Sequence, residues 1–248
     1  TEKNSVYIDL KDPNSIKMAI KKTTPSLVIN PAAYTKVDQA EEEKDLAFAI
    51  NASSIKIFAK ELVKINCPII HLSTDHVYNP QHSLPIKESE PYQPINYYGK
   101  TKLRGDNYLQ TLHPAHIILR TSWVYDTRGH NFVKTILRLC QEKTSLQVVD
   151  NQVGAPTAAS SLANLVEKIL DLAQNNLWQY FKEKKGTYHA SDKDFISWAD
   201  FAEKIISYAS KYTKTTCKVK KIKSSQYKSK AKRPLNSRLN CKKAMDTL

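Results

Sequence analysis

The stretch CPIIHLSTDHVY, from Cys67 to Tyr78, places an apolar run directly before a group of hydroxyl and carboxyl side chains. A short, continuous apolar run of this kind is typical of a buried strand in a parallel sheet. Ligands bind such sheets at the carboxyl ends of the strands. We therefore expect a strand at residues 68–73 and a binding site that begins at Ser73, Thr74 and Asp75.

Apolar runs and helix-forming segments alternate on both sides of this strand. Residues 26–30 and 116–120 predict two more buried strands, and residues 45–65 and 97–110 predict the helices between them. Strands that alternate with helices of this length indicate βαβ units, and therefore an α/β fold with a Rossmann-like, doubly wound parallel sheet. The same reasoning predicts strands at 6–8, 146–149, 187–189 and 218–222, and helices at 15–22, 131–142, 158–174 and 197–211.

The net charge of +14 comes from 38 Lys and Arg residues against 24 Asp and Glu residues. Such a charge attracts polyanions in general, including nucleic acids and nucleotide diphosphates. However, the lysines are spread over the whole chain, and the densest run, residues 218–233, contains Tyr227 as its one aromatic residue. That run is typical of a solvated edge strand followed by a loop, so we expect no nucleic-acid partner.

No apolar stretch approaches the roughly 20 residues that span a bilayer, and the first residues contain no apolar segment of the secretory type. The four cysteines, Cys67, Cys140, Cys217 and Cys241, lie far apart and form no CxxC pair. This spacing argues against a zinc site and predicts free thiols in a reducing compartment. We expect a cytoplasmic protein with no membrane partner.

Tyr98 and Lys102 lie four residues apart on the helix expected at 97–110, so their side chains share one face. An ammonium held beside a phenol lowers the pKa of the phenol, which can then exchange a proton with a carbonyl or alcohol oxygen. With Thr74 at the neighbouring strand end, the three residues predict a catalytic Thr–Tyr–Lys group. The competing interpretation is a surface tyrosine beside a solvated lysine.

Several motifs together resemble the dTDP-4-dehydrorhamnose reductases, a family of extended short-chain dehydrogenases/reductases. The matching stretches run in the family's order along nearly the whole chain. They are VINPAAYTKVDQAE (28–41), HLSTDHVY (71–78), YGKTKLRGD (98–106), LRTSWVY (119–125), NFVKTILRL (131–139), VVDNQVGAPT (148–157) and RPLNSRL (233–239).

The resemblance implies reduction of the 4-keto group of dTDP-4-dehydro-L-rhamnose by NADPH or NADH, with Tyr98 as the general acid and with Lys102 and Thr74 as its catalytic partners. It places the cofactor on Asp9, Leu10, Ala33, Tyr34, Thr35, Tyr98 and Lys102. It places the sugar nucleotide on Thr74, Asp75 and Trp123, with Arg233 and Asn236 near the substrate lobe. The competing interpretations are a core aromatic for Trp123 and a turn or helix-capping hydroxyl for Thr74.

The chain departs from the family pattern at its glycines. The five glycines are Gly99, Gly105, Gly129, Gly154 and Gly186, and none of them opens an early βα unit as a phosphate-binding turn would. We therefore expect a Rossmann-like sheet without its first βα unit, in a cofactor domain at 1–154. A smaller mixed substrate lobe is expected at 155–248, with some segments that return to the first domain.

Two alternatives to the enzyme remain open at this point. One is a non-catalytic binding subunit of the same fold, similar to the methionine adenosyltransferase regulatory β subunit, and the other is the product of a decaying gene. The resemblance also leaves open a homodimer and Mg²⁺, although no carboxylate cluster in the sequence supports a metal site.

Overall fold

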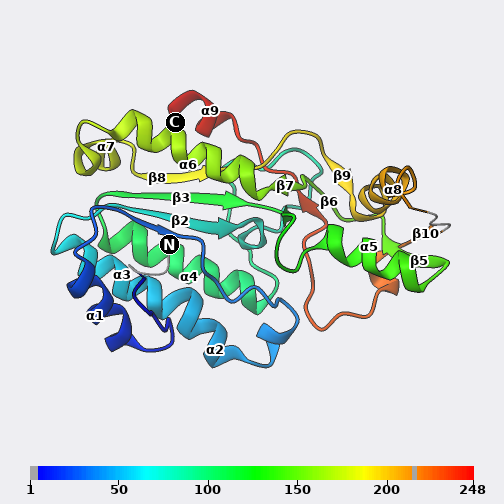
Figure 1. Ribbon diagram of the computed structural model, residues 1–248, viewed down its shortest axis with the longest axis horizontal. Helices are drawn as coiled ribbons and strands as arrows, with labels where there is room; N and C mark the ends of the chain where they lie inside the picture. Colours follow the sequence, from blue (N-terminus) through cyan, green and yellow to red (C-terminus); the bar gives the residue numbers. More distant parts are fainter. Residues whose placement is uncertain (1–4, 214–216) are drawn as a thin grey trace.

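The computed structural model describes residues 5–213 and 217–248, which fold around a parallel sheet with the strand order β1-β2-β3-β8 (Figure 1). These strands are β1 (Val28–Asn30), β2 (Ile69–Thr74), β3 (His116–Thr121) and β8 (Gly186–His189). The register pairs Thr74 with Thr121, so that β2 and β3 end at the same edge of the sheet. The expected α/β fold with a parallel sheet is confirmed.

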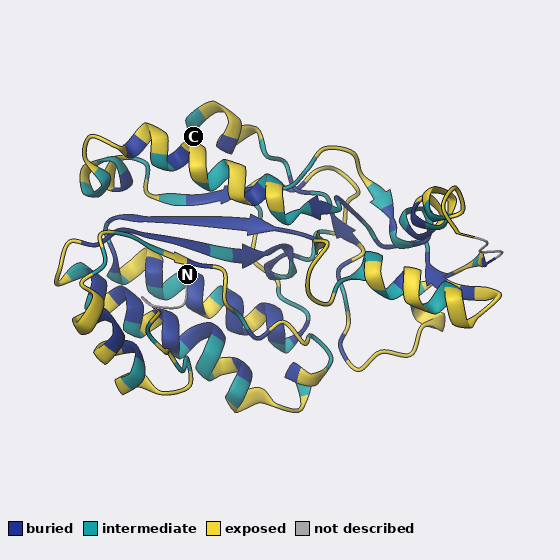
Figure 2. Cartoon of the chain, in the orientation of Figure 1, coloured by how far each residue is buried: buried dark blue, intermediate teal, exposed yellow. Residues whose placement is uncertain are grey.

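Helices cover both faces of this sheet (Figure 1). One face carries α1 (Pro13–Thr23), α3 (Ser54–Val63) and α4 (Tyr97–Leu112), and the other carries α6 (Ala159–Ala173), α7 (Leu177–Glu183) and α9 (Lys242–Thr247). The strands are buried along most of their length, whereas the helices expose their outer surfaces (Figure 2). The arrangement is the doubly wound one that the sequence predicted.

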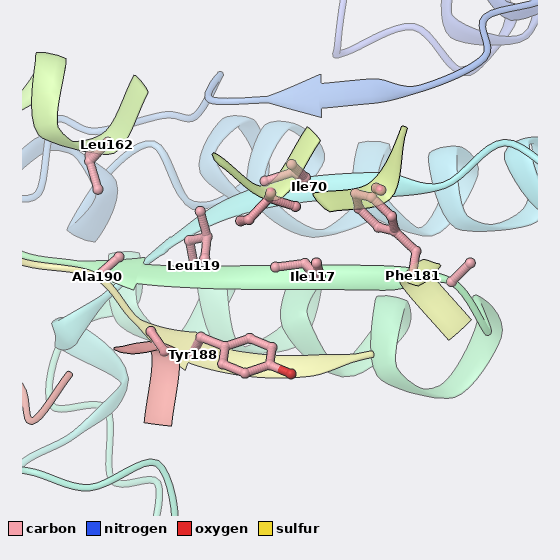
Figure 3. Close-up of a cluster of buried hydrophobic side chains, with 11 residues drawn as sticks. Ile70, Ile117, Leu119, Leu162, Phe181, Tyr188 and Ala190 are labelled. Carbon is pink, nitrogen blue, oxygen red and sulfur yellow. The ribbon is translucent and has the colours of Figure 1, made fainter. Parts of the chain in front are cut away.

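Alternation along the strands explains how both faces obtain a core. Ile69 and Ile118 pack with the helices on the α3 side, whereas Ile70 and Ile117 pack with those on the α6 side. Figure 3 shows the second cluster, in which strand side chains meet Phe181 of α7. A strand that is buried on both faces needs apolar residues at every position, which is why these segments read as continuous apolar runs.

The helix expected at 45–65 is present but contains a π-helical turn. It consists of α2 (Lys44–Phe48), the π turn η3 (Ala49–Ser53) and α3. Within the π turn, buried Asn51 accepts a hydrogen bond from the Tyr34 backbone N–H at 2.8 Å and donates to the Tyr34 carbonyl at 3.1 Å. The turn therefore ties the segment after β1 to the helix layer, in agreement with the tendency of π turns to occur near functional sites.

A smaller lobe has its own hydrophobic cluster. It is built from α5 (Phe132–Glu142), β5 (Ser145–Val149), α8 (Trp198–Ala209) and β10 (Lys218–Ile222), and β5 pairs with β10 in parallel. Because α5 and β5 precede residue 154, both sides of the expected boundary contribute to this lobe, and the boundary itself stays a prediction. Short strands complete the structure: β4 (Val124–Tyr125), β6 (Val153–Gly154), β7 (Thr157–Ala158), β9 (Ile196–Ser197) and β11 (Asn236–Ser237).

The strand expected at 6–8 is wrong. These residues have no regular secondary structure, and Tyr7 is 83% exposed. A strand needs a neighbour for its backbone hydrogen bonds, and within the described residues β1 pairs only with β2. Two helices that the sequence did not predict, α7 and α9, cover the α6 side of the sheet.

The four cysteines, which all lie in the described part of the chain, form no disulfide, and Cys140 and Cys217 share a hydrogen bond. Among residues 5–213 and 217–248, no helix is both long and apolar enough to cross a membrane. Over the same ranges, no three His, Cys, Asp or Glu side chains gather as ligands for a metal ion.

We predict that Gly105→Ala destabilises the chain, although alanine is the better helix former. A Cβ atom at position 105 would lie 2.2 Å from the Asn51 carbonyl oxygen, so α4 and the π turn would have to separate. Overpacking of this kind costs about 1–3 kcal/mol in the free energy of unfolding, which urea denaturation measures. The control is Lys100→Ala at an exposed position of the same helix. Equal stabilities of the two variants would show that a Cβ atom at position 105 does not clash with the Asn51 carbonyl.

Candidate active site

Tyr98 and Thr74 meet where α4 begins and β2 ends. The Asn96 side chain caps α4 by accepting a hydrogen bond from the Gly99 backbone N–H at 2.8 Å, which fixes Tyr98 in the first turn. The Tyr98 phenol and the Thr74 side chain share a hydrogen bond. Both side chains are buried, with exposed fractions of 9% and 5%. The structure therefore brings together two of the three residues of the predicted catalytic group.

The expected lowering of the Tyr98 pKa is wrong. Burial raises the pKa of Tyr98 above its usual value, and the charges of Asp75 and Asp106 raise it further, whereas the neighbouring Thr74 side chain lowers it. The phenol is therefore protonated at neutral pH, and this is the form that can donate a proton.

Lys102, the third member, directs its amine towards β2 rather than into the solvent. The side chain is buried, its Nζ donates a hydrogen bond to the Leu72 carbonyl at 2.7 Å, and His71 Nε2 lies 3.1 Å away. The interpretation of Lys102 as a solvated surface residue is thereby excluded. The amine occupies the layer between α4 and β2, one helical turn behind Tyr98.

Asp75 adds an acceptor to the group. Its Oδ1 accepts a hydrogen bond from the Thr74 hydroxyl at 3.2 Å, while its Oδ2 is buried without a hydrogen-bond partner. A buried carboxylate oxygen without a partner is costly unless a ligand or water satisfies it. Thr74 Oγ1 also accepts from the His76 backbone N–H and so caps the short helix η4 (Asp75–Val77). Thr74 is therefore a capping hydroxyl, and its catalytic and substrate-binding roles stay predictions.

A buried ion pair that the sequence analysis missed supports the group from behind. Arg120 of β3 and Asp106 of α4 are both fully buried and meet at 2.9 Å, and Ser73 donates to the same carboxylate oxygen at 2.9 Å. Arg120 also donates to the Tyr78 hydroxyl at 2.6 Å. Two signals were present in the sequence: Asp106 follows Lys102 by four residues, and Arg120 ends an otherwise apolar run.

The residues expected after β1 lie beside Tyr98 but differ in what they offer to a ligand. Tyr34 packs in one cluster with Tyr98, and its hydroxyl donates to Glu43 at 2.7 Å. The Tyr34 backbone N–H is already bound to Asn51, so the one backbone donor of this residue is not available to a cofactor. Ala33 is half-buried and Thr35 is exposed, and these two remain open towards solvent.

Asp9 and Leu10 lie in the turn before α1. The Asp9 backbone N–H donates to Ser15 at 2.9 Å, and its carboxylate accepts from the Lys11 backbone N–H at 2.9 Å. Leu10 packs against the core cluster on the α3 side of the sheet. Their assignment to the cofactor adenine stays a prediction.

Trp123 follows β3 with a positive φ of 50° and stacks on Trp198 of the smaller lobe, with ring centroids 3.5 Å apart. Gly154 makes room for it, since a Cβ atom at that position would lie 2.8 Å from the indole ring. Trp123 is half-buried, so one part of the ring is packed and another is accessible. The core interpretation and the substrate interpretation of Trp123 are therefore compatible.

Arg233 and Asn236 connect segments of the protein. Arg233 forms an ion pair with Asp38 at 2.6 Å, and the Asn236 amide donates to the carbonyls of His82 at 2.8 Å and of Leu84 at 2.9 Å. Both side chains therefore fasten the C-terminal segment onto other parts of the chain. Their expected place near the substrate stays a prediction.

A groove of about 1110 Å³ between α6 and α9 is lined by Leu165, Met245 and Leu248, among others. Neither Tyr98 nor Thr74 lines it. The residues of the predicted catalytic group therefore lie outside this groove.

We predict that Asp106→Asn lowers the free energy of unfolding by about 3–5 kcal/mol, because it leaves the Arg120 charge buried without its partner. Urea denaturation followed by circular dichroism measures the change. The control is Asp246→Asn, which breaks an exposed ion pair with Lys242 on α9 and costs at most about 1 kcal/mol. Similar losses of unfolding free energy in both variants would show that the buried pair stabilises the fold no more than the exposed pair does.

Comparison with known proteins identifies the family of the chain. The model of the RmlD substrate binding domain matches residues 2–248. A dTDP-4-dehydrorhamnose reductase of Salmonella typhimurium is 38% identical over 237 residues, which cover 95% of this chain and 78% of the relative. Another such reductase, from Sinorhizobium fredii, is 37% identical over 235 residues, with the same coverage of 95% and 78%.

Solved structures give the same result. A dTDP-4-dehydrorhamnose reductase of Clostridium acetobutylicum superposes with a TM-score of 0.85 at 35% identity, over 94% of this chain and 78% of that one. The Bacillus anthracis reductase, solved in complex with NADP, superposes with a TM-score of 0.84 at 33% identity and the same coverage. The chain therefore belongs to the RmlD substrate binding domain family, which includes the dTDP-4-dehydrorhamnose reductases.

Proposed function

We propose that this protein reduces the 4-keto group of dTDP-4-dehydro-L-rhamnose with NADPH and so forms dTDP-L-rhamnose, a nucleotide sugar for cell-surface polysaccharides. The observation that carries the proposal is the hydrogen-bonded pair of Thr74 and Tyr98 beside the unpaired, buried Asp75 Oδ2. Two hydroxyl donors and one acceptor at a strand end match a keto oxygen and a neighbouring sugar hydroxyl.

The side chains have distinct roles in this reaction. The Tyr98 phenol is the general acid: it gives its proton to the sugar oxygen as negative charge develops there. Thr74, anchored by the His76 backbone N–H, turns its hydroxyl to the same oxygen and orients the ketone. Asp75 Oδ2 accepts a hydrogen bond from a sugar hydroxyl and thereby loses the cost of being buried without a partner.

The residues present fit the reactive end of a nicotinamide cofactor. Ala33 and Thr35 are accessible in the segment that follows β1. Tyr34, which stands between them in the sequence, packs in one cluster with Tyr98. When bound, NADPH supplies the hydride.

The smaller lobe supports the nucleotide part of the substrate. The accessible part of Trp123 is held rigid by its stack on Trp198 and offers a flat apolar surface for the sugar nucleotide. The net charge of +14 favours approach of the doubly charged diphosphate. Four cysteines without a disulfide fit a reducing compartment such as the cytoplasm, and a homodimer stays a prediction.

We predict that Tyr98→Phe lowers kcat by about 10²–10⁴-fold, because the proton donor is lost while the packing of the ring is kept. The rate is followed as oxidation of NADPH in the presence of dTDP-4-dehydro-L-rhamnose. The matched control is Tyr97→Phe, which removes the neighbouring hydroxyl and should leave kcat unchanged.

Binding of NADPH, followed by its fluorescence, separates the possible outcomes. Full activity of the Tyr98→Phe variant would contradict the role of the phenol. A wild-type chain that binds NADPH or the sugar nucleotide without turnover would support the binding-subunit alternative, and a chain that binds neither would contradict the proposal altogether.

A further inference from the structure

A chain of hydrogen bonds runs from the end of β1 to the amine of Lys102. The Asn30 side-chain oxygen accepts from the Ala32 backbone N–H at 3.1 Å, and the Asn30 amide nitrogen lies 3.1 Å from His71 Nδ1. The other ring nitrogen, His71 Nε2, lies 3.1 Å from Lys102 Nζ. Asn30, His71 and Lys102 are all buried, so water does not replace these bonds.

The direction of each bond follows from what the groups can donate. The Ala32 N–H can only donate, so the atom of the Asn30 amide that faces it must be the oxygen. The NH₂ group of the same amide therefore faces His71. An amide NH₂ also only donates, so His71 Nδ1 must accept. A neutral imidazole carries one proton, and that proton is therefore on Nε2.

The Nε2–H of His71 points towards Lys102 and Asp106. Asp106 Oδ1 is buried without a hydrogen-bond partner and lies 4.0 Å from Nε2. An ammonium at Lys102 would place N–H against N–H, whereas a neutral amine can accept the His71 proton and still donate to the Leu72 carbonyl. The bonding pattern is thus complete only when the Lys102 amine is neutral.

We propose that Asn30 and His71 are positioning residues that disfavour the charged form of Lys102 and so set the pH at which Lys102 acquires its charge. The importance of this for catalysis rests on the proposed function, in which Lys102 belongs to the catalytic group. Neither Asn30 nor His71 touches the reacting atoms; both act through Lys102.

The surrounding charges agree with this assignment. Burial lowers the pKa of Lys102 to about 8, although the negative charge of Asp106 on the same helix raises it. Burial and the Lys102 charge lower the pKa of His71 well below its usual value, so the imidazole is neutral. The other charged group of this layer, Arg120 on β3, is paired with Asp106, and Tyr98 on α4 is protonated.

The first test is the tautomer of His71 in the full chain, read from ¹⁵N spectra of histidine-labelled protein at about pH 9, above the pKa of Lys102. We expect a protonated Nε2 and an unprotonated Nδ1. Two other buried histidines are internal references. His113 donates from Nε2 to the Cys67 carbonyl at 3.1 Å, and His116 donates from Nδ1 to the His113 carbonyl at 2.6 Å. The variant His71→Gln assigns the His71 signal by removing it, and an Nδ1–H pattern at His71 would overturn the proposal.

The second test is Asn30→Asp, which keeps an acceptor for the Ala32 N–H but replaces the NH₂ donor by a second acceptor. We expect the His71 proton to move to Nδ1 and the titration of Lys102 to rise by about one pH unit or more, a tenfold change in the protonation ratio. ¹³C-lysine spectra follow the titration, and Lys102→Arg assigns the signal.

The negative charge that Asn30→Asp introduces by itself raises the pKa of Lys102 without moving the His71 proton. A raised Lys102 pKa with an unchanged His71 tautomer would therefore contradict the proposal. If Asn30→Asp does not fold, the wild-type tautomer and the wild-type Lys102 titration decide: an ordinary lysine pKa near 10.4 would overturn the proposal. Neither test uses NADPH or sugar, so a chain that fails to reduce the ketosugar can still pass both.

Discussion

The buried ion pair between Asp106 and Arg120 fixes α4 against the central sheet. Both residues are fully buried, and the arginine donates to the same carboxylate oxygen through Nε at 3.1 Å and through its terminal nitrogen at 2.9 Å. Geometry with two donors is what makes such a pair tolerable in a low-dielectric interior. Because Asp106 lies two helical turns after Tyr98, the pair determines where the phenol stands relative to the end of β2. The site depends on this one contact between a helix and a strand.

From this contact the polar layer extends in two directions. Towards the substrate it ends in Thr74, Tyr98 and the unpaired oxygen of Asp75, which face the carboxyl edge of the sheet. Away from the substrate it continues through Lys102 and His71 to Asn30 at the edge strand. A buried network of this kind stabilises the fold only when nearly every polar group in it has a hydrogen-bond partner. Two of its carboxylate oxygens, Asp75 Oδ2 and Asp106 Oδ1, can still accept a hydrogen bond.

Much of the fold was predictable because buried parallel strands leave continuous apolar runs, as at residues 68–73 and 116–120. The meeting of Thr74 and Tyr98 was predictable too, since it needs only a strand end and the first turn of the next helix. The direction of the Lys102 amine was not predictable, because a flexible four-carbon side chain can reach either a phenol or a carbonyl from the same helical position.

Other parts of the site depend on contacts between distant segments and left no local signal. The pairing of Asp38 with Arg233 joins residues 195 positions apart, and the Asn51 amide reaches the backbone of Tyr34 only because a π turn interrupts the helix. The strand expected at 6–8 failed for the opposite reason: its residues favour a strand, but the described chain gives them no neighbour for their backbone groups.

The central claim is that the Thr74 hydroxyl and the Tyr98 phenol act on one sugar oxygen. A crystal structure of the chain with NADP and dTDP-L-rhamnose tests it most directly. The account predicts that O4 of the sugar lies within hydrogen-bond distance, about 2.6–3.2 Å, of both Tyr98 Oη and Thr74 Oγ1. A sugar bound with O4 away from these two oxygens would contradict it.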